Sequence, residues 1–407
     1  MLWWQTSWML PKKTKMREYT DGATAVVRGA LDAGCNFFAG YPISPATPIL
    51  IQMLRDLPAV GGVAVQAEDE IASISMCIGA VMAGARAMTA TSGPGLSLYS
   101  ESIGLAVMGE VPLVIVDVQR AGPATGGATT VGQGDIQFAR WGTSGGYPIL
   151  ALCPSSVPEC YTLTMRAFDL AERFRCPAFL MTDKELNLTT TTVDADEFVA
   201  MPVRERSKAQ AIGEQGADEF RPYQFNPPDA VPPLACLGGS HITRFTGSSH
   251  DEHGLLIKDP AVVGALNQHL FEKIEAHRQE TELVKADLQP GAKMLVISYG
   301  ITARAVEEAV QEARRKSQGV STLTLQSLWP VPENAIRSAL DGVERIIVAE
   351  LNLGEYRQEI ERIAGDRRVV GLNRVDGELI SPEQILSAIA DPLDLFHSSL
   401  HSKMIPL

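Results

Sequence analysis

Short, almost continuous apolar runs recur along the first half of the chain. They occupy residues 36–40, 88–91, 111–118, 148–152 and 177–182. Unbroken apolar runs of this length are typical of strands that are buried on both faces of a parallel sheet. Residues 103–108 and 157–174 read as helices between such runs. The alternation predicts an α/β domain with a parallel sheet over residues 16–193.

The same rhythm returns near the C-terminal end. Apolar runs at 294–299, 321–325 and 345–350 predict three more strands, and residues 302–316 predict a helix after the first of them. We therefore expect a second α/β domain over residues 291–407.

The intervening residues 194–290 differ from both domains in composition. Residues 203–256 are rich in charge, proline and glycine, which indicates a linker and an excursion, and a helix is predicted over 260–287. At the N-terminus, three of the five tryptophans lie within the first eight residues, and the basic Lys12 and Lys13 follow them. A signal peptide has its basic residues before its apolar stretch, so this order argues against one. We expect residues 1–15 to be a disordered extension or an upstream translation start, with a partner-contact arm as the alternative.

Polar or rigid segments follow three of the predicted strands. The first segment, residues 41–49, follows the strand at 36–40 and holds three prolines around Ser44. In the second segment, Ser92 and Gly93 follow the strand at 88–91. In the third, Arg120 follows the strand at 111–118. Because the carboxyl ends of parallel strands meet at one edge of a sheet, all three should open on the same edge, where α/β folds place ligand sites. Plain turns between strands and helices are the alternative reading for the first two, and a surface ion pair is the alternative for Arg120.

Three successive acids, Glu68, Asp69 and Glu70, lead into an apolar segment of small residues. The spacing of Ile71, Ile74, Ile78 and Val81 predicts a helix that begins at or near the acids. Small residues around almost the whole helix predict burial by a close neighbour. Acids favour a helix N-terminus, which accounts for two of the three.

Composition narrows the function. The formal net charge of −13 argues against generic nucleic-acid binding. The six scattered cysteines include no Cys-x-x-Cys pair, so no iron–sulfur cluster is expected on this chain, and their pattern favours a reducing cytoplasm. No apolar run reaches the length of a membrane span. A phosphate loop and a convincing dinucleotide fingerprint are also absent.

Three motifs carry a resemblance to a known family. They are Tyr-Pro-Ile-Ser-Pro at 41–45, Thr-Ser-Gly-Pro-Gly at 91–95 and Asp-Val-Gln-Arg-Ala-Gly-Pro-Ala-Thr-Gly at 117–126. In this order they resemble the alpha subunit of the 2-oxoacid:ferredoxin oxidoreductases, which are multi-subunit thiamine-diphosphate enzymes. The resemblance runs from about Met16 to the C-terminus. Ser44 stands where the family usually has threonine, a change that keeps the hydroxyl and loses a methyl group.

The resemblance implies a fold and a set of site residues. The fold would be the pyrimidine-binding half of a thiamine-diphosphate enzyme, followed by a transketolase C-terminal-like α/β domain. Glu70, with Glu68 as the alternative, would hydrogen-bond the pyrimidine ring of the cofactor, and Arg120 and Ser44 would contact the substrate carboxylate. Tyr41, Pro42, Ile43, Ser92 and Gly93 would line the cofactor site, or the coenzyme A channel in the case of Ser92 and Gly93.

The resemblance also implies partners, because the Mg-diphosphate signature Gly-Asp-Gly…Asn of thiamine enzymes is missing here. A beta subunit would carry Mg²⁺, the diphosphate site and a [4Fe-4S] cluster, further small subunits would join it, and ferredoxin would accept the electrons. The implied reaction converts a 2-oxoacid and coenzyme A into acyl-CoA and CO₂. The family likeness favours 2-oxoglutarate, with branched-chain 2-oxoacids or pyruvate next. The alternatives are a scaffold subunit without catalysis and a stand-alone thiamine decarboxylase.

Two further polar segments each have two possible roles. The loop 246–254 holds His250, Asp251, Glu252 and His253, for which a metal site is one reading and a hydrogen-bonded loop at a subunit contact is the preferred one. Glu350 and Asn352 end a predicted strand, where capping is preferred over an interface or coenzyme A site.

Overall fold

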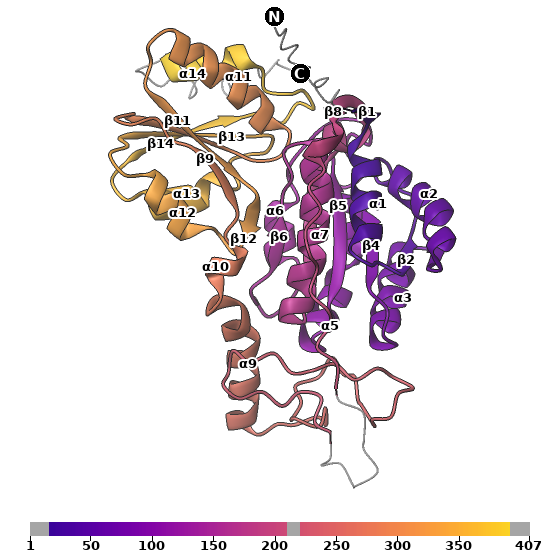
Figure 1. Cartoon of the computed structure of the whole chain (residues 1–407). Coiled ribbons are helices and arrows are strands. Elements are labelled where there is room, and N and C mark those ends of the chain that lie inside the picture. The colour runs from indigo at the N-terminus through magenta and orange to yellow at the C-terminus, as the bar shows by residue number, and fades with distance from the viewer. Residues whose placement is uncertain (1–15, 210–219, 391–407) are drawn as a thin grey trace, which may run out of the picture.

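The computed structural model describes residues 16–209 and 220–390. Figure 1 shows two α/β lobes side by side and an arm of loops and one helix that projects from them. The extension predicted for residues 1–15 lies outside the described residues. The boundaries at 194 and 290 stay predictions.

The first lobe is built on a seven-stranded sheet with the order β12-β6-β7-β5-β4-β2-β3. Its strands are β2 (Phe37–Gly40), β3 (Val63–Gln66), β4 (Ala87–Thr91), β5 (Leu113–Gln119), β6 (Leu150–Leu152), β7 (Ala178–Asp183) and β12 (Ser327–Trp329). All neighbours pair in parallel except β12 and β6. The predicted parallel sheet is therefore present, with one antiparallel strand at its end.

Helices cover both faces of this sheet. The alternation along β5 shows why, since Val114 and Val116 join one buried cluster while Leu113 and Ile115 join the other. The first cluster includes residues of α1 (Gly22–Asp32), α2 (Thr47–Asp56) and α7 (Val157–Phe174). The second includes residues of α3 (Glu70–Met82), α4 (Gly93–Leu98), α5 (Ser100–Met108) and α6 (Ile136–Trp141).

Short elements close the ends of this lobe. The strands β1 (Arg17–Thr20) and β8 (Thr191–Asp194) form an antiparallel pair. The remaining elements are η1 (Pro58–Val60), α8 (Lys184–Leu188) and η2 (Ala195–Glu197).

The second lobe holds a five-stranded sheet with the order β14-β13-β10-β11-β9. Its strands are β9 (Val284–Asp287), β10 (Met294–Ser298), β11 (Val320–Leu325), β13 (Arg345–Glu350) and β14 (Arg368–Asn373), and only β9 runs antiparallel. Residues of α11 (Thr302–Arg315) and α14 (Pro382–Ala390) pack in one buried cluster and those of α12 (Glu333–Ala339) and α13 (Arg357–Ala364) in the other.

The two lobes are joined by more than the connecting chain. Strand β12 follows β11 in sequence but pairs with β6, and the indole N–H of Trp329 donates to the Ile136 carbonyl at 2.9 Å. Asn352 donates to the Gln133 carbonyl at 2.8 Å, and its side-chain oxygen accepts the backbone N–H groups of Gly354 and Glu355. Asn352 therefore caps a turn and contacts the first lobe as well.

The arm consists of residues 220–276 and contains α9 (Pro260–Glu275). The helix predicted over 260–287 is wrong at its C-terminal end, because α9 gives way to the short α10 (Arg278–Thr281) and then to strand β9. Residues 284–287 find backbone partners on β11, and this pairing overrides the local helical pattern.

One face of α3 contradicts the burial predicted for the whole helix. Ile74, Ile78 and Val81 are buried, whereas Ile71 is 51% and Met76 is 41% exposed. A β-carbon on Gly79 would meet no atom within 4 Å. Among the described residues no neighbour covers this side of the helix.

Candidate active site

The ends of four neighbouring parallel strands define the candidate site, which we call the carboxyl edge. It is the side of the first sheet on which β2, β3, β4 and β5 end. The proline loop after β2, Ser92 after β4 and Arg120 after β5 lie at this edge, as the sequence predicts. Glu70 reaches the same edge at the start of α3, which follows β3.

Arg120 and the proline loop are in direct contact. The Nη1 group of Arg120 donates to the Ser44 carbonyl at 2.5 Å, across a separation of 76 residues. Arg120 is 6% exposed, and its Nε has no acceptor among the described residues. Ser44 itself is exposed. The arrangement leaves a buried cation with spare donors beside an accessible hydroxyl, which suits a carboxylate ligand.

The three acids before α3 occupy different environments. Asp69 is exposed and caps the helix, because its carboxylate accepts the Ala72 N–H at 2.7 Å. Glu68 is also exposed, whereas Glu70 is 6% exposed. No hydrogen bond or ion pair between described residues involves the Glu70 carboxylate. Burial without a partner distinguishes Glu70 from the two acids before it.

Glycines of the 91–95 motif make room for carboxyl groups. A β-carbon on Gly95 would lie 2.8 Å from Glu70 Oε1, and one on Gly93 would lie 2.8 Å from Asp135 Oδ1. Ser92, at the N-terminus of α4, is fully buried, and its hydroxyl has no hydrogen-bond partner among the described residues. The motif thus brings bare backbone and an unpaired hydroxyl next to two acids.

The remaining residues of the proline loop have a different environment. Tyr41 is 37% exposed and Pro42 is also exposed, while Ile43 is half-buried and packs against the core. They therefore offer a surface rather than an enclosed pocket.

Sequence reasoning missed two acids at this edge. Asp117, inside β5, is fully buried, and burial followed by the charge of Asp135 raises its pKa well above the ordinary range. Burial also raises the pKa of Asp135 to about 6, although the charge of Arg120 opposes the rise. An acid within an otherwise apolar strand was the available signal for Asp117. Nothing local marked Asp135, which follows a glycine-rich loop.

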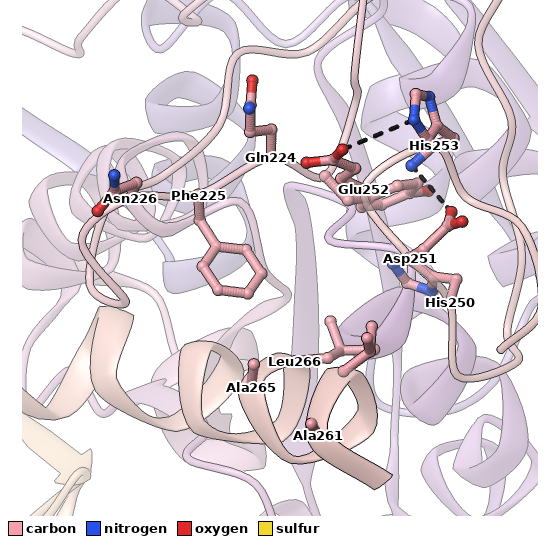
Figure 2. A pocket seen from close by; sticks show the side chains of 12 residues that line it. Gln224, Phe225, Asn226, His250, Asp251, Glu252, His253, Ala261, Ala265 and Leu266 are labelled. Atoms are coloured by element: carbon pink, nitrogen blue, oxygen red, sulfur yellow. Dashed lines mark hydrogen bonds and ion pairs between the residues drawn. The ribbon is translucent and has the colours of Figure 1, made fainter. Parts of the chain in front are cut away.

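A separate cavity of about 790 Å³ lies in the arm. Figure 2 shows that residues of the 246–254 loop line one side of it and that Ala261, Ala265 and Leu266 of α9 line another. His250 is 1% exposed, and its Nδ1 is 2.9 Å from the Ser248 carbonyl, while burial lowers its pKa. Asp251 accepts the backbone N–H groups of His253 and Leu255. The described residues include no group of three or more potential metal ligands, and the loop polar groups are used mainly to shape the loop.

Matches to a solved structure and to two family models define the class of protein. A split-gene transketolase described as an inactive beta4 tetramer matches with a TM-score of 0.51 and 9% identity over 90% of this chain and 95% of its own, which indicates a shared fold. Residues 28–260 match the model of the pyruvate flavodoxin/ferredoxin oxidoreductase thiamine-diphosphate-binding domain, and residues 292–385 match core domain II of pyruvate:ferredoxin oxidoreductase. The fold is thus a thiamine-diphosphate-binding-type α/β domain with a transketolase-like α/β domain, as predicted.

Closer relatives narrow this class. The 2-oxoglutarate synthase subunit KorA of Methanothermobacter thermautotrophicus is 41% identical over 91% of this chain and 97% of its own. The 2-oxoglutarate:ferredoxin oxidoreductase of Magnetococcus marinus, solved with 2-oxoglutarate, coenzyme A and succinyl-CoA, matches with a TM-score of 0.86 and 30% identity, over 93% of this chain and 66% of that longer one. The chain belongs to the pyruvate flavodoxin/ferredoxin oxidoreductase family.

Proposed function

We propose that this chain is the alpha subunit of a 2-oxoglutarate:ferredoxin oxidoreductase. The complex would convert 2-oxoglutarate and coenzyme A into succinyl-CoA and CO₂, and would pass two electrons to ferredoxin. The observation that carries the proposal is Glu70, a buried residue whose carboxylate has no partner among the described residues, at the same sheet edge as the contact between Arg120 and Ser44. The relatives named for 2-oxoglutarate support the choice of substrate.

Glu70 fits thiamine diphosphate because a buried carboxylate without a partner suits a proton shared with a ring nitrogen. The cofactor, when bound, supplies the nucleophilic carbon that attacks the 2-oxo group. Glu70 would hold the pyrimidine ring in the tautomer that can take up the C2 proton. Tyr41, Pro42 and Ile43 would pack beside that ring. Ser92 and Gly93 would offer a hydroxyl and backbone N–H groups at the same edge.

Arg120 and Ser44 would bind the 1-carboxylate of the substrate. The guanidinium group is buried and oriented by the Ser44 carbonyl, which leaves its other N–H groups for an anion. The Ser44 hydroxyl would add one hydrogen bond. Together these contacts would orient the 2-oxo carbon, an effect that lowers the barrier by fixing geometry before the reaction.

The rest of the enzyme would lie on partner subunits. A beta subunit would contribute Mg²⁺, the diphosphate site and the [4Fe-4S] cluster, and further small subunits and ferredoxin would join it. The uncovered side of α3, with Ile71 and Met76, supports a partner at this place, because large apolar side chains favour a covered position. We place the complex in the cytoplasm, since the six cysteines are free thiols. No helix of the described residues is long and apolar enough to span a membrane.

The test is anaerobic purification of the native complex through this chain, followed by coenzyme A-dependent reduction of viologen. The rates with 2-oxoglutarate, pyruvate and 2-oxoisovalerate are compared at equal concentration. We expect 2-oxoglutarate to give the highest kcat/KM. A preference for either other acid would keep the reaction and overturn the substrate. A complex that retains thiamine diphosphate and its clusters but reduces no viologen with any acid would favour a scaffold subunit.

A further inference from the structure

The buried side chain of Asn187 has no role in the function proposed above. Asn187 is fully buried, and its Nδ2 group donates to the Pro45 carbonyl at 2.9 Å, across a separation of 142 residues. We propose that Asn187 is a positioning residue for substrate binding, because it holds the proline loop where the Ser44 carbonyl can orient Arg120. This inference rests on the proposed binding of the substrate carboxylate by Arg120 and Ser44.

Two side chains from distant parts of the chain hold the proline loop. Its three prolines carry no backbone N–H groups, so the loop has few donors of its own. Arg120 Nη1 donates to the Ser44 carbonyl at 2.5 Å, and Asn187 binds the next carbonyl along the chain, that of Pro45. Because only one residue separates the two carbonyls, a shift at Pro45 also moves the carbonyl of Ser44.

The order of strands explains why the loop needs contacts at its far side. The loop follows β2, whereas Arg120 follows β5 and Asn187 lies in α8, which follows β7. In the sheet, β4 lies between β2 and β5, and β7 lies beyond β5. The loop thus reaches past the end of a whole strand before it meets either donor. The pairing of β2 alone cannot fix the loop at that distance.

Helix α8 gives Asn187 a rigid base. The Asp183 carboxylate caps this helix, because it accepts the Leu186 N–H at 3.0 Å, and its other oxygen accepts the Ile301 N–H of the second lobe at 2.9 Å. A β-carbon on Gly22, the first residue of α1, would clash with the Leu186 carbonyl, so α1 and α8 are in close contact. A side chain on an element fixed in this way can set the position of a loop.

Loss of the Asn187 amide would remove one of the two contacts of the loop. Pro45 is buried, and a buried carbonyl without a donor costs free energy. The loop would therefore move until the Pro45 carbonyl meets another donor or water, and the Ser44 carbonyl would move with it. Arg120 would then lose the acceptor that orients its guanidinium group. A misplaced guanidinium binds a carboxylate less well, because two parallel hydrogen bonds need a fixed geometry.

The experiment compares Asn187→Ala with the wild type in the assembled complex by coenzyme A-dependent viologen reduction. We expect KM for 2-oxoglutarate to rise about tenfold, as for the loss of a hydrogen bond to a buried group, while KM for coenzyme A changes less than about twofold. Asn36→Ala is the matched control. Asn36 accepts the Arg86 N–H at 2.8 Å just before β2, at the opposite edge of the same sheet, so its loss should leave both constants unchanged.

A double-mutant cycle with Arg120→Lys separates positioning from a general structural effect. If Asn187 acts through Arg120, Asn187→Ala should change KM for 2-oxoglutarate by less than about twofold in the Arg120→Lys background. A general structural effect would instead raise KM by the same factor in both backgrounds. Equal factors would therefore overturn the proposal, and so would a wild-type KM in Asn187→Ala.

If Asn187→Ala does not assemble, Asn187→Leu, which retains the bulk of the buried side chain, replaces it in the cycle. Failure of both variants to assemble would make Asn187 a residue required for folding and would also overturn the positioning role. The proposed function is tested separately by the wild type. If the wild type prefers another 2-oxoacid, KM for that acid is measured in the same cycle, since every 2-oxoacid has the 1-carboxylate. A wild-type complex that oxidises no 2-oxoacid would instead reject the proposed function.

Discussion

Two groups of buried charge in this chain have opposite environments. The first, which we call the anchor cluster, consists of Glu110, Arg175, His269 and Lys273, and it ties α9 to the first lobe. Glu110 Oε2 is 2.9 Å from Lys273 Nζ and 3.0 Å from His269 Nε2. Burial alone would raise the pKa of Glu110, but Lys273, Arg175 and His269 lower it. The second group is the carboxyl edge, where Glu70 has no partner among the described residues and burial raises the pKa values of Asp117 and Asp135.

The charged groups of the anchor cluster stabilise the fold, whereas those of the carboxyl edge are available to bind a ligand. In the anchor cluster the acid is paired within the chain, although its Oε1 has no donor among the described residues. At the carboxyl edge several buried polar groups have no donor or acceptor among the described residues, an arrangement that costs free energy and that a bound ligand, water or a partner chain can relieve. Substitutions should therefore reduce activity at one place and stability at the other.

The largest expected effect is on turnover. Glu70→Gln should lower kcat of the assembled complex by about 10²- to 10⁴-fold, because it removes the carboxylate that would take part in proton transfer. The melting temperature should hardly change, since the carboxylate makes no hydrogen bond or ion pair within the part of the chain that the structure describes. Viologen reduction and thermal unfolding of the same preparation check both statements.

Glu68→Gln is the matched control, because Glu68 is exposed two residues away. Its turnover should equal that of the wild type. The assignment would be reversed if Glu68→Gln were the inactive variant.

The next effect is on stability. Lys273→Met should lower the free energy of unfolding by about 3–5 kcal/mol, because it leaves a buried carboxylate without its main cation. Glu110 also gives this contribution a pH dependence. Its folded-state pKa is lowered, so the stabilisation is present above the ordinary pKa of about 4.3 and is lost as the pH falls further. Denaturant unfolding of the full chain at pH 7 and pH 3, for the wild type and for Lys273→Met, measures the lost free energy of unfolding and its pH dependence.

Lys293→Met is the control for this substitution. Lys293 pairs with Glu344 at 3.0 Å, but the two side chains are 65% and 71% exposed, so less than about 1 kcal/mol should be lost. Equal losses in both variants would show that the anchor cluster is no different from a surface pair.

A smaller effect is expected on substrate affinity. Arg120→Lys keeps the charge but loses the planar set of donors, so KM for 2-oxoglutarate should rise about 10- to 100-fold. KM for coenzyme A should stay within a factor of two, which distinguishes lost carboxylate binding from general damage. Arg55→Lys, at an exposed ion pair with Asp56, should leave both constants unchanged.

The smallest effect concerns Ser44. Ser44→Thr restores the usual family residue and should change KM by less than about threefold, because the hydroxyl is kept. Ser44→Ala should raise KM by up to about tenfold through loss of one hydrogen bond. Steady-state kinetics of both variants, measured side by side, check that KM rises more in Ser44→Ala than in Ser44→Thr. A larger effect of the threonine would mean that the added methyl group clashes, and that Ser44 was selected for its size.

The sequence predicts the central strands well because they are buried on both faces. The apolar run at 111–118 becomes β5, and its end correctly places Arg120 at the carboxyl edge. Strand β9 was missed because it is an edge strand with Lys285 and Asp287, so its pattern carries no long apolar run. Its pairing with β11 joins residues 35 to 41 positions apart, which no local pattern reports.

The site was predictable only as far as its residues follow strands. Ser44, Ser92 and Arg120 are marked by motifs at strand ends, whereas Asp135 lies in a loop and comes near Asp117 only through the fold. For the exposed side of α3, by contrast, a local sequence pattern was present but its expected neighbour was not found among the described residues. Its small apolar residues predict a neighbour over the whole helix, but the described residues of this chain leave Ile71 and Met76 exposed.

Strand β12 limits how this chain can be divided. It belongs by sequence to the C-terminal half, yet it completes the sheet of the N-terminal half next to β6. A gene split between the two halves would leave the first fragment with β6 as a bare edge, open to pairing with other chains. An exchange of halves among relatives would therefore have to carry residues 327–329 with the first half if β6 is to keep this neighbour.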